Sequence, residues 1–149
     1  MRAKLSQGER IVLVAGVLLI ADLLFVPWHD IELPGDVEAL VDTTRTGVQA
    51  VYPAYGIAAV VLTAVMIAQI VVATVLSVRL PESVPWSQIH LLLGIFVAVV
   101  LVIKLVRLTD SLGYGAYSGV LAGILVAYGG WRISREAEGP TDAAESGSG

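Results

Sequence analysis

Four long apolar segments constrain the fold of this chain more than any other feature of its sequence. They cover residues 11–28, 52–78, 89–107 and 112–131, and each approaches or exceeds the ~20 residues that an α-helix needs to cross a bilayer. Hydrophobic residues make up 56% of the 149 residues, charged residues make up 15%, and the mean hydropathy is +0.82. A soluble domain has about 25% charged residues. The sequence therefore predicts an all-α membrane protein with four transmembrane helices in an up-down bundle.

The ends of these segments carry helix-boundary signals. Pro27 and Trp28 close the first segment, and Pro53 stands in the first turn of the second, where its missing N–H removes no hydrogen bond. Only about four residues, Asp110 and Ser111 among them, separate the third and fourth segments, which predicts an antiparallel helical hairpin. No small-x-small cleavage site follows the first segment, so we expect a retained helix rather than a signal peptide.

The distribution of lysine and arginine predicts the orientation, because the side with more basic residues near the span ends faces the cytoplasm. Arg45, Lys104 and Arg107 fall on one side. The other side carries six basic residues: Arg2, Lys4, Arg10, Arg79, Arg132 and Arg135. We therefore expect a cell-membrane protein with both termini in the cytoplasm. Residues 1–10 then form a cytoplasmic N-terminus, and residues 29–51 form an outer loop.

Two segments outside the predicted spans have distinct patterns. In the outer loop, Pro34-Gly35-Asp36 is typical of a turn that ends in a helix N-cap, and apolar residues follow it at helical spacing. We expect a short amphipathic element there. Residues 133–149 are polar and have few apolar side chains, which predicts a disordered cytoplasmic tail.

Asp22 is the most informative single residue, because a carboxylate inside a span costs ~2.5–3.5 kcal/mol unless it finds a partner or water. It lies ~9 Å below Trp28, and Lys104 lies ~9 Å below Asp110. The first and third spans run in the same direction, so the two charges share a depth. We predict an intramembrane ion pair between Asp22 and Lys104, with Arg107 as a further partner or extending outward. The leading interpretation is a structural pair that fixes helix register, and the alternative is a transport or proton-relay site.

Small residues recur at every fourth position of the last span, which places a smooth stripe along one helix face. Such a stripe permits another helix to approach closely. The stripe consists of Gly115, Gly119, Gly123 and Ala127. The second span offers small residues at Ala64 and Ala68. We therefore predict a helix-packing face on the last span, with the second and fourth spans as neighbours or dimer partners.

The sequence has no catalytic, cofactor or metal signature. It contains no cysteine, which rules out thiolate ligands and cysteine nucleophiles. His29 and His90 fall at opposite ends of spans, ~30 Å apart in bilayer depth, so they are not expected to share a ligand. Phosphate-binding, zinc-protease and serine-hydrolase motifs are absent, as is a dense basic patch for nucleic acid. We expect no enzymatic activity, no cofactor, no metal and no nucleic-acid partner.

Short motifs near the predicted outer ends of the spans carry a family resemblance. The first span ends in Leu24-Phe25-Val26-Pro27-Trp28, the outer loop closes with Thr46-Gly47, and the last span opens with Gly113-Tyr114-Gly115-Ala116-Tyr117. Together with the charged N-terminus, this pattern resembles small four-span membrane proteins of actinobacteria over nearly the whole chain. The resemblance implies a cytoplasmic-membrane location and a four-helix topology. It supplies no catalytic residues.

Two functions remain open. The leading hypothesis is a non-enzymatic structural or accessory subunit that packs in the bilayer with a membrane-protein partner or a second copy of itself. The alternative is a small transporter or channel component, in which Asp22, Lys104 and Gln69 line a polar path. A membrane-bound enzyme has the least support. A dry pair between Asp22 and Lys104 would favour the first hypothesis, whereas a water-filled cavity that reaches both would favour the second.

Overall fold

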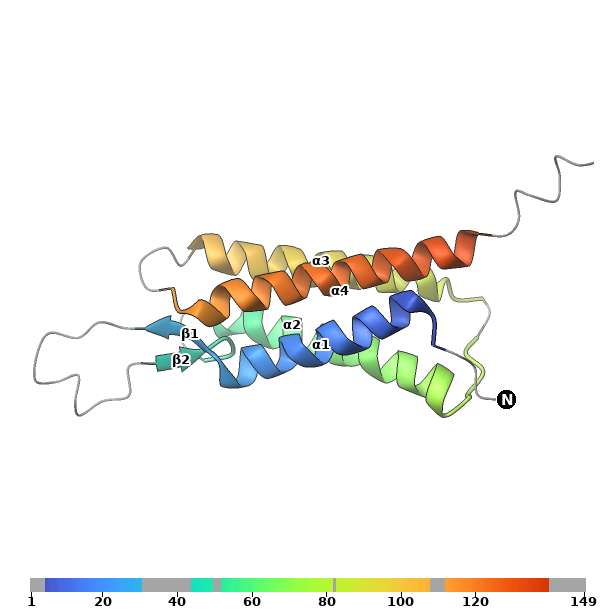
Figure 1. Ribbon diagram of the computed structural model, residues 1–149, viewed down its shortest axis with the longest axis horizontal. Helices are drawn as coiled ribbons and strands as arrows, with labels where there is room; N and C mark the ends of the chain where they lie inside the picture. Colours follow the sequence, from blue (N-terminus) through green and yellow to red (C-terminus); the bar gives the residue numbers. More distant parts are fainter. Residues whose placement is uncertain (1–4, 31–43, 50–51, 82, 108–111, 140–149) are drawn as a thin grey trace, which may run out of the picture.

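A computed structural model describes residues 5–30, 44–49, 52–81, 83–107 and 112–139. These residues form four long helices: α1 (Gln7–Phe25), α2 (Pro53–Ile70), α3 (Trp86–Arg107) and α4 (Tyr114–Glu138). The π-helical turn η2 (Val71–Val75) continues α2, and two short strands, β1 (Pro27–Asp30) and β2 (Thr44–Thr46), lie at one end of the bundle (Figure 1). The prediction of an all-α fold of four packed helices is confirmed. The strand pair was not predicted.

The four helices lie side by side, with α4 packed along both α1 and α3, and α2 packed against the same two helices (Figure 1). α3 and α4 form the predicted antiparallel hairpin: a Cβ on Gly94 would lie 2.9 Å from the Cα atom of Ala127, and one on Gly123 would lie 2.7 Å from the Cδ1 atom of Leu101. Among the described residues, α2 and α4 share no such interface. The predicted pairing of the second and fourth spans within the bundle is therefore wrong, because the small residues of α4 already face α1 and α3.

α1 begins earlier than the apolar pattern indicates. Ser6 is its N-cap and forms a reciprocal capping box with Glu9: Glu9 N–H donates to Ser6 Oγ at 3.2 Å, and Ser6 N–H donates to Glu9 Oε2 at 2.7 Å. These bonds satisfy backbone donors that a helix start leaves free. Glu9 and Arg10, which the apolar pattern leaves outside the first span, are therefore helical.

α4 ends later than the apolar pattern indicates. Its last turns reach Glu138, so residues 133–138, which were assigned to the disordered tail, are helical. Glu136 Oε1 accepts a hydrogen bond from Gly8 N–H at 3.3 Å and lies 3.5 Å from Arg132 Nη2. An acidic side chain at the start of α1 is favoured by the helix dipole. Residues 140–149 lie outside the described residues.

The strands join three parts of the chain at one end of the bundle, which we call the strand end. β1 pairs with β2 in antiparallel register, with Asp30 opposite Thr44. On its other side, His29 forms a bridge with Leu112, and Gly113 N–H donates to the Trp28 carbonyl at 2.8 Å. The amphipathic element that the sequence predicts falls on residues 31–43, which lie outside the described residues. The opposite end, where α1 begins and α4 ends, is called the terminal end below.

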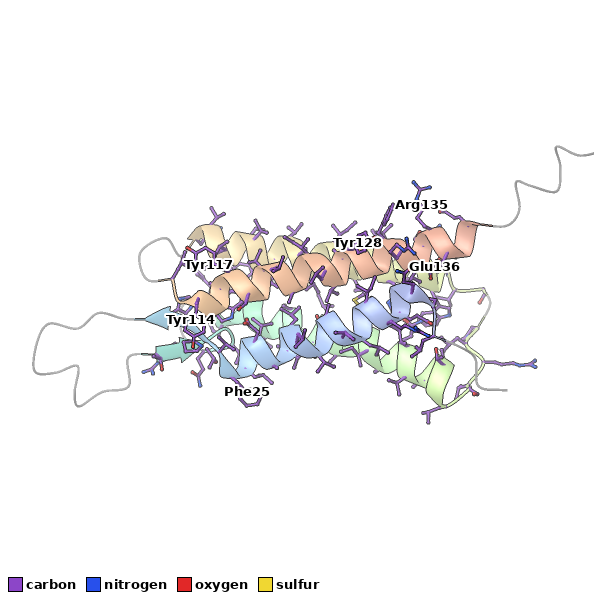
Figure 2. All side chains as sticks on the ribbon, in the orientation of Figure 1. Phe25, Tyr114, Tyr117, Tyr128, Arg135 and Glu136 are labelled. Carbon is purple, nitrogen blue, oxygen red and sulfur yellow. The ribbon has the colours of Figure 1, made fainter. Side chains whose placement is uncertain are left out.

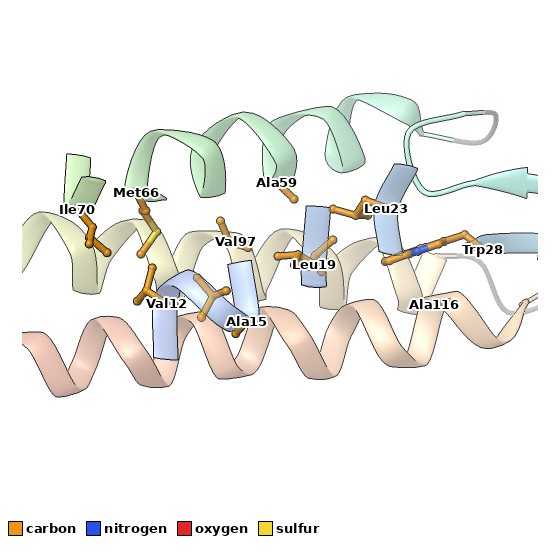
Figure 3. Packing of buried hydrophobic residues seen from close by; sticks show 12 residues of the cluster. Val12, Ala15, Leu19, Leu23, Trp28, Ala59, Met66, Ile70, Val97 and Ala116 are labelled. Atoms are coloured by element: carbon orange, nitrogen blue, oxygen red, sulfur yellow. The ribbon is translucent and has the colours of Figure 1, made fainter. Parts of the chain in front are cut away.

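The interior of the bundle is a continuous apolar core that runs from Val12 near the terminal end to Trp28 at the strand end (Figure 3). All four helices contribute to it, and Leu19, Leu23 and Met66 are fully buried. The few polar side chains that are also buried come from several elements. They are Asp22, His29, Thr63, Thr74, His90, Lys104 and Ser134.

The outside of the bundle also carries large apolar side chains, which stand out from every helix in Figure 2. Within the described residues, two helical stretches are apolar and long enough to cross a bilayer: α2 with most of η2 (Pro53–Thr74), and α3. α1 contains Glu9, Arg10 and Asp22, and α4 is rich in glycine. Two membrane-length apolar helices are thus present within a four-helix fold.

Candidate functional site at the strand end

Asp22 is buried where α1, β1 and α4 meet. Only 7% of its surface is exposed. Its Oδ2 atom accepts a hydrogen bond from Trp28 Nε1 at 2.8 Å, and its Oδ1 atom accepts one from Ser118 Oγ. Each carboxylate oxygen therefore has one donor, and hydrogen bonds to a carboxylate are among the stronger ones in proteins.

Lys104 lies over the face of the Trp28 ring and is fully buried. Its ammonium group is 5.0 Å from the centre of the Trp28 ring, and it donates a hydrogen bond to the Gly47 carbonyl. A cation over a tryptophan face gains about 2 kcal/mol or more when the pair is shielded from water. Lys104 therefore links α3 to the segment after β2, through one backbone carbonyl and one aromatic ring.

The structure does not place Asp22 and Lys104 in direct contact. An ion pair is present instead between Arg132 and Glu136, at the terminal end. The predicted ion pair is replaced by a three-part arrangement, because the Trp28 indole donates from its edge to Asp22 and offers its face to Lys104. The shared depth of the two charges was anticipated, but the aromatic ring between them was not.

Arg107 does not belong to this cluster. Its side chain is exposed, and its guanidinium lies 5.6 Å from the ring centre of Tyr52, at the start of α2. The predicted alternative for this residue was an outward extension from the end of the span. That alternative stays a prediction.

Two glycines permit the cluster to close. A Cβ on Gly119 would lie 2.6 Å from Asp22 Oδ2 and still closer to the Trp28 ring. A Cβ on Gly47 would lie 3.1 Å from Trp28 Cε2. Real Cβ atoms essentially never approach within 3.0 Å of such atoms, so Gly119 must stay a glycine if Trp28 and Asp22 are to keep these positions.

The whole small-residue stripe of α4 faces inward. Gly115 contacts Pro27, Gly119 contacts Trp28 and Asp22, Gly123 contacts Leu101, and Ala127 contacts Gly94. The stripe thus packs against α1, β1 and α3 of the same chain. It is not a free surface for a second protein.

A groove lies between α1 and α4 beside the cluster. Its volume is about 460 Å³, and its polar lining residues are Asp22 and Ser118. The rest of the lining is apolar: Leu18, Ala21, Phe25, Val26, Leu121, Ala122 and Leu125. A second groove of about 390 Å³ shares Leu18 and Leu125 with the first and reaches Arg10 along the same helix pair. We call the two together the α1–α4 groove.

The remaining buried polar groups are spread along the bundle. At the terminal end, Thr74 Oγ1 donates to Glu9 Oε1 at 3.4 Å, and the Nδ1 atom of His90, a residue 3% exposed, has no hydrogen-bond partner. His29 is buried at the strand end, so the two histidines lie at opposite ends of the bundle. No group of three or more potential metal-ligating side chains occurs within the described ranges.

Comparison of the chain with protein families, with curated proteins and with solved structures finds no match in any of the three.

Proposed function

We propose that the chain is a four-span integral membrane protein with the strand end outside the cell and both termini in the cytoplasm. The polarity of the bundle supports this proposal, because Asp22 and Lys104 are buried while large apolar side chains cover the outside of all four helices. A soluble bundle has the opposite arrangement, with charged residues outside. α1 and α4 are less apolar in sequence than α2 and α3, but Asp22 and the glycines that lower their hydropathy face the interior.

Aromatic residues at both ends of the bundle support the same placement. Tyr114 and Tyr117 are exposed near the strand end, and Tyr128 and Trp131 are exposed toward the terminal end (Figure 2 labels three of them). Tyr114 and Trp131 are separated by ~26 Å along the axis of α4, at 1.5 Å per residue, close to the ~30 Å hydrocarbon thickness of a bilayer. Tyrosine and tryptophan are enriched at both membrane interfaces.

Within the membrane, the proposed role is that of a non-enzymatic accessory subunit that packs against another membrane protein through α2. The observation that carries this role is a regular exposed seam on α2. Its residues are Ala54, Ile57, Val61, Ala64 and Ala68, which are all exposed. They alternate at spacings of three and four residues, which places them along one face of the helix. Three of the five are alanines, which permit close approach between helices in lipid.

The α2 seam replaces the surface that the sequence indicated. The stripe on α4 was expected to meet a partner or the second span, yet it is filled by α1, β1 and α3 of the same chain. The inward side of α2, with Ala59, Thr63, Met66 and Ile70, packs in the core, so the seam is the opposite face of that helix. A second candidate role, ligand binding from the lipid phase, is supported by the α1–α4 groove at Asp22. Lys104 is fully buried and does not line that groove, so Asp22 is the one of these two charged residues that a ligand in the groove would meet.

Photo-crosslinking from native membranes tests the accessory role. With a photo-reactive residue at Ala64, we expect a covalent adduct with one partner protein or a second copy, which mass spectrometry of the adduct identifies. The matched control places the same group at Val99, which is also exposed, at 48%, but lies on α3. Adducts at Ala64 with lipid alone, or equal protein adducts at both positions, would contradict a partner-binding seam on α2.

A further inference from the structure

Two neutral hydrogen-bond donors hold the Asp22 carboxylate. Trp28 and Ser118 are neutral, and the described residues place no lysine or arginine nitrogen within 4.0 Å of it. A carboxylate accepts about four hydrogen bonds, of which two are filled here. A buried charge without a partner is costly, and a cation that reaches it from a low-dielectric side is attracted strongly.

We propose that the α1–α4 groove binds a single-chain organic ammonium from the lipid phase, with its ammonium head on Asp22 and its apolar chain along the seam between α1 and α4. The inference rests on the proposed placement of the bundle in the membrane. The part of the groove beside Asp22 provides the two features that such a ligand needs: one carboxylate with a neighbouring hydroxyl, Ser118, and an otherwise apolar lining. Its volume of about 460 Å³ lies within the ~300–1,000 Å³ of small-molecule sites.

The second groove gives the apolar chain a continuous path. It shares Leu18 and Leu125 with the first and extends past Val14 toward the terminal end. Asp22 and Val14 are separated by ~12 Å along α1, at 1.5 Å per residue. Both grooves open sideways between two helices whose outer faces are apolar, so the entry path leads from lipid rather than from water.

The depth of Asp22 selects a simple ammonium over a phospholipid head group. Asp22 lies ~6 Å from Val26 along α1, toward the middle of the helix, at 1.5 Å per residue. The Trp28 ring and Gly119 close the space on the side of Asp22 that faces the bundle interior. The ammonium of phosphatidylethanolamine is linked to a phosphate, which would be drawn toward the same carboxylate. Two negative groups in a desolvated site repel each other. A hydrated inorganic cation would meet an almost wholly apolar lining, which offers no ligands to replace its water.

The test uses the full chain in phosphatidylcholine nanodiscs, with dodecylammonium as the probe and dodecanol as its neutral match. The reporter is the indole N–H signal of Trp28 in ¹H–¹⁵N spectra, assigned by Trp28→Phe, because this N–H donates to Asp22. Dodecylammonium is expected to shift the signal saturably. In Asp22→Asn the affinity should fall by about tenfold or more, because the charge is lost.

A second variant keeps the test decisive if Asp22→Asn does not fold. Ala21→Leu adds bulk to the groove and removes neither hydrogen-bond donor of Asp22, so it should abolish saturable binding while the Trp28 signal stays close to its resting position. The matched control, Val99→Leu on the exposed side of α3, should bind like the wild type. Equal shifts with dodecanol would overturn the role of charge, and a shift in phosphatidylethanolamine nanodiscs without probe would assign the site to a lipid head group. Failure of binding would leave the four-span topology untouched.

Discussion

Gly119→Leu is expected to prevent accumulation of the folded protein in the membrane. The added side chain would meet the Trp28 ring and Asp22 Oδ2 at distances that no Cβ tolerates, and both partners are themselves fixed. Trp28 is fully buried and Asp22 is held by two hydrogen bonds, so neither can move away without losing its own contacts. Overpacking a core typically costs ~1–3 kcal/mol, and displacement of a hydrogen-bonded carboxylate adds to that.

The matched control for this variant is Gly139→Leu, where the nearest atom to an added Cβ is the Arg135 carbonyl oxygen at 3.4 Å. Membrane fractions are quantified by immunoblot, and the free energy of unfolding is measured by denaturant titration in mixed micelles. Gly139→Leu should accumulate like the wild type. Normal accumulation and unchanged stability of Gly119→Leu would show that the inward packing of the α4 stripe is wrong.

Trp28→Ala should lower the free energy of unfolding by ~3–5 kcal/mol, the usual cost of truncating a large buried aromatic side chain. Trp28 serves three partners at once: its ring packs on the α4 stripe, its N–H donates to Asp22, and its face carries Lys104. Removal of the ring leaves a cavity between two buried charged residues. The unfolding free energy in mixed micelles, followed by far-UV circular dichroism, measures the loss.

Trp28→Phe separates packing from the hydrogen bond. It keeps an aromatic face for Lys104 but removes the donor to Asp22, which should cost ~1–3 kcal/mol for the acceptor left without its partner. The control is Trp86→Phe, because the Trp86 indole donates to the Pro81 carbonyl at an exposed site. Equal free energies of unfolding for Trp28→Phe and Trp86→Phe would show that the hydrogen bond from Trp28 to Asp22 does not stabilise the fold.

The helices were predictable because their signals are local. Apolar runs of membrane length identify α2 and α3, and the short connection between the last two segments identifies the α3–α4 hairpin. The terminal turns were missed, because α1 starts with the capping residues Ser6 and Glu9, and α4 ends with the charged residues Arg135 and Glu136. A search for apolar runs does not detect such residues. Their helical state is supported by contacts between the start of α1 and the end of α4, such as the hydrogen bond from Gly8 N–H to Glu136.

The candidate site was predictable only in part, since it depends on residues far apart in the chain. Depth counting placed Asp22 and Lys104 at one level, but only the fold brings Trp28 between them and Ser118 onto Asp22. The pairing of β1 with the segment before α4 turns Trp28 inward, and short strands of this kind leave little signal in sequence. The repeated spacing of glycines in α4 did indicate a close contact, although its partner was assigned to the wrong helix.

The central claim, that all four helices cross the membrane, is tested most directly by single-cysteine labelling. The chain contains no cysteine, so each introduced thiol reports on one position only. Thr44→Cys in β2, Ser83→Cys before α3 and Ala137→Cys near the end of α4 are all placed at exposed positions. A membrane-impermeant maleimide is applied to intact cells and to inverted vesicles.

With four spans, the thiols at positions 83 and 137 should react only in inverted vesicles, and the thiol at position 44 only in intact cells. If α2 and α3 alone crossed the bilayer, position 137 would lie on the same side as position 44. Labelling of positions 44 and 137 from one side, with position 83 on the other, would contradict the four-span account.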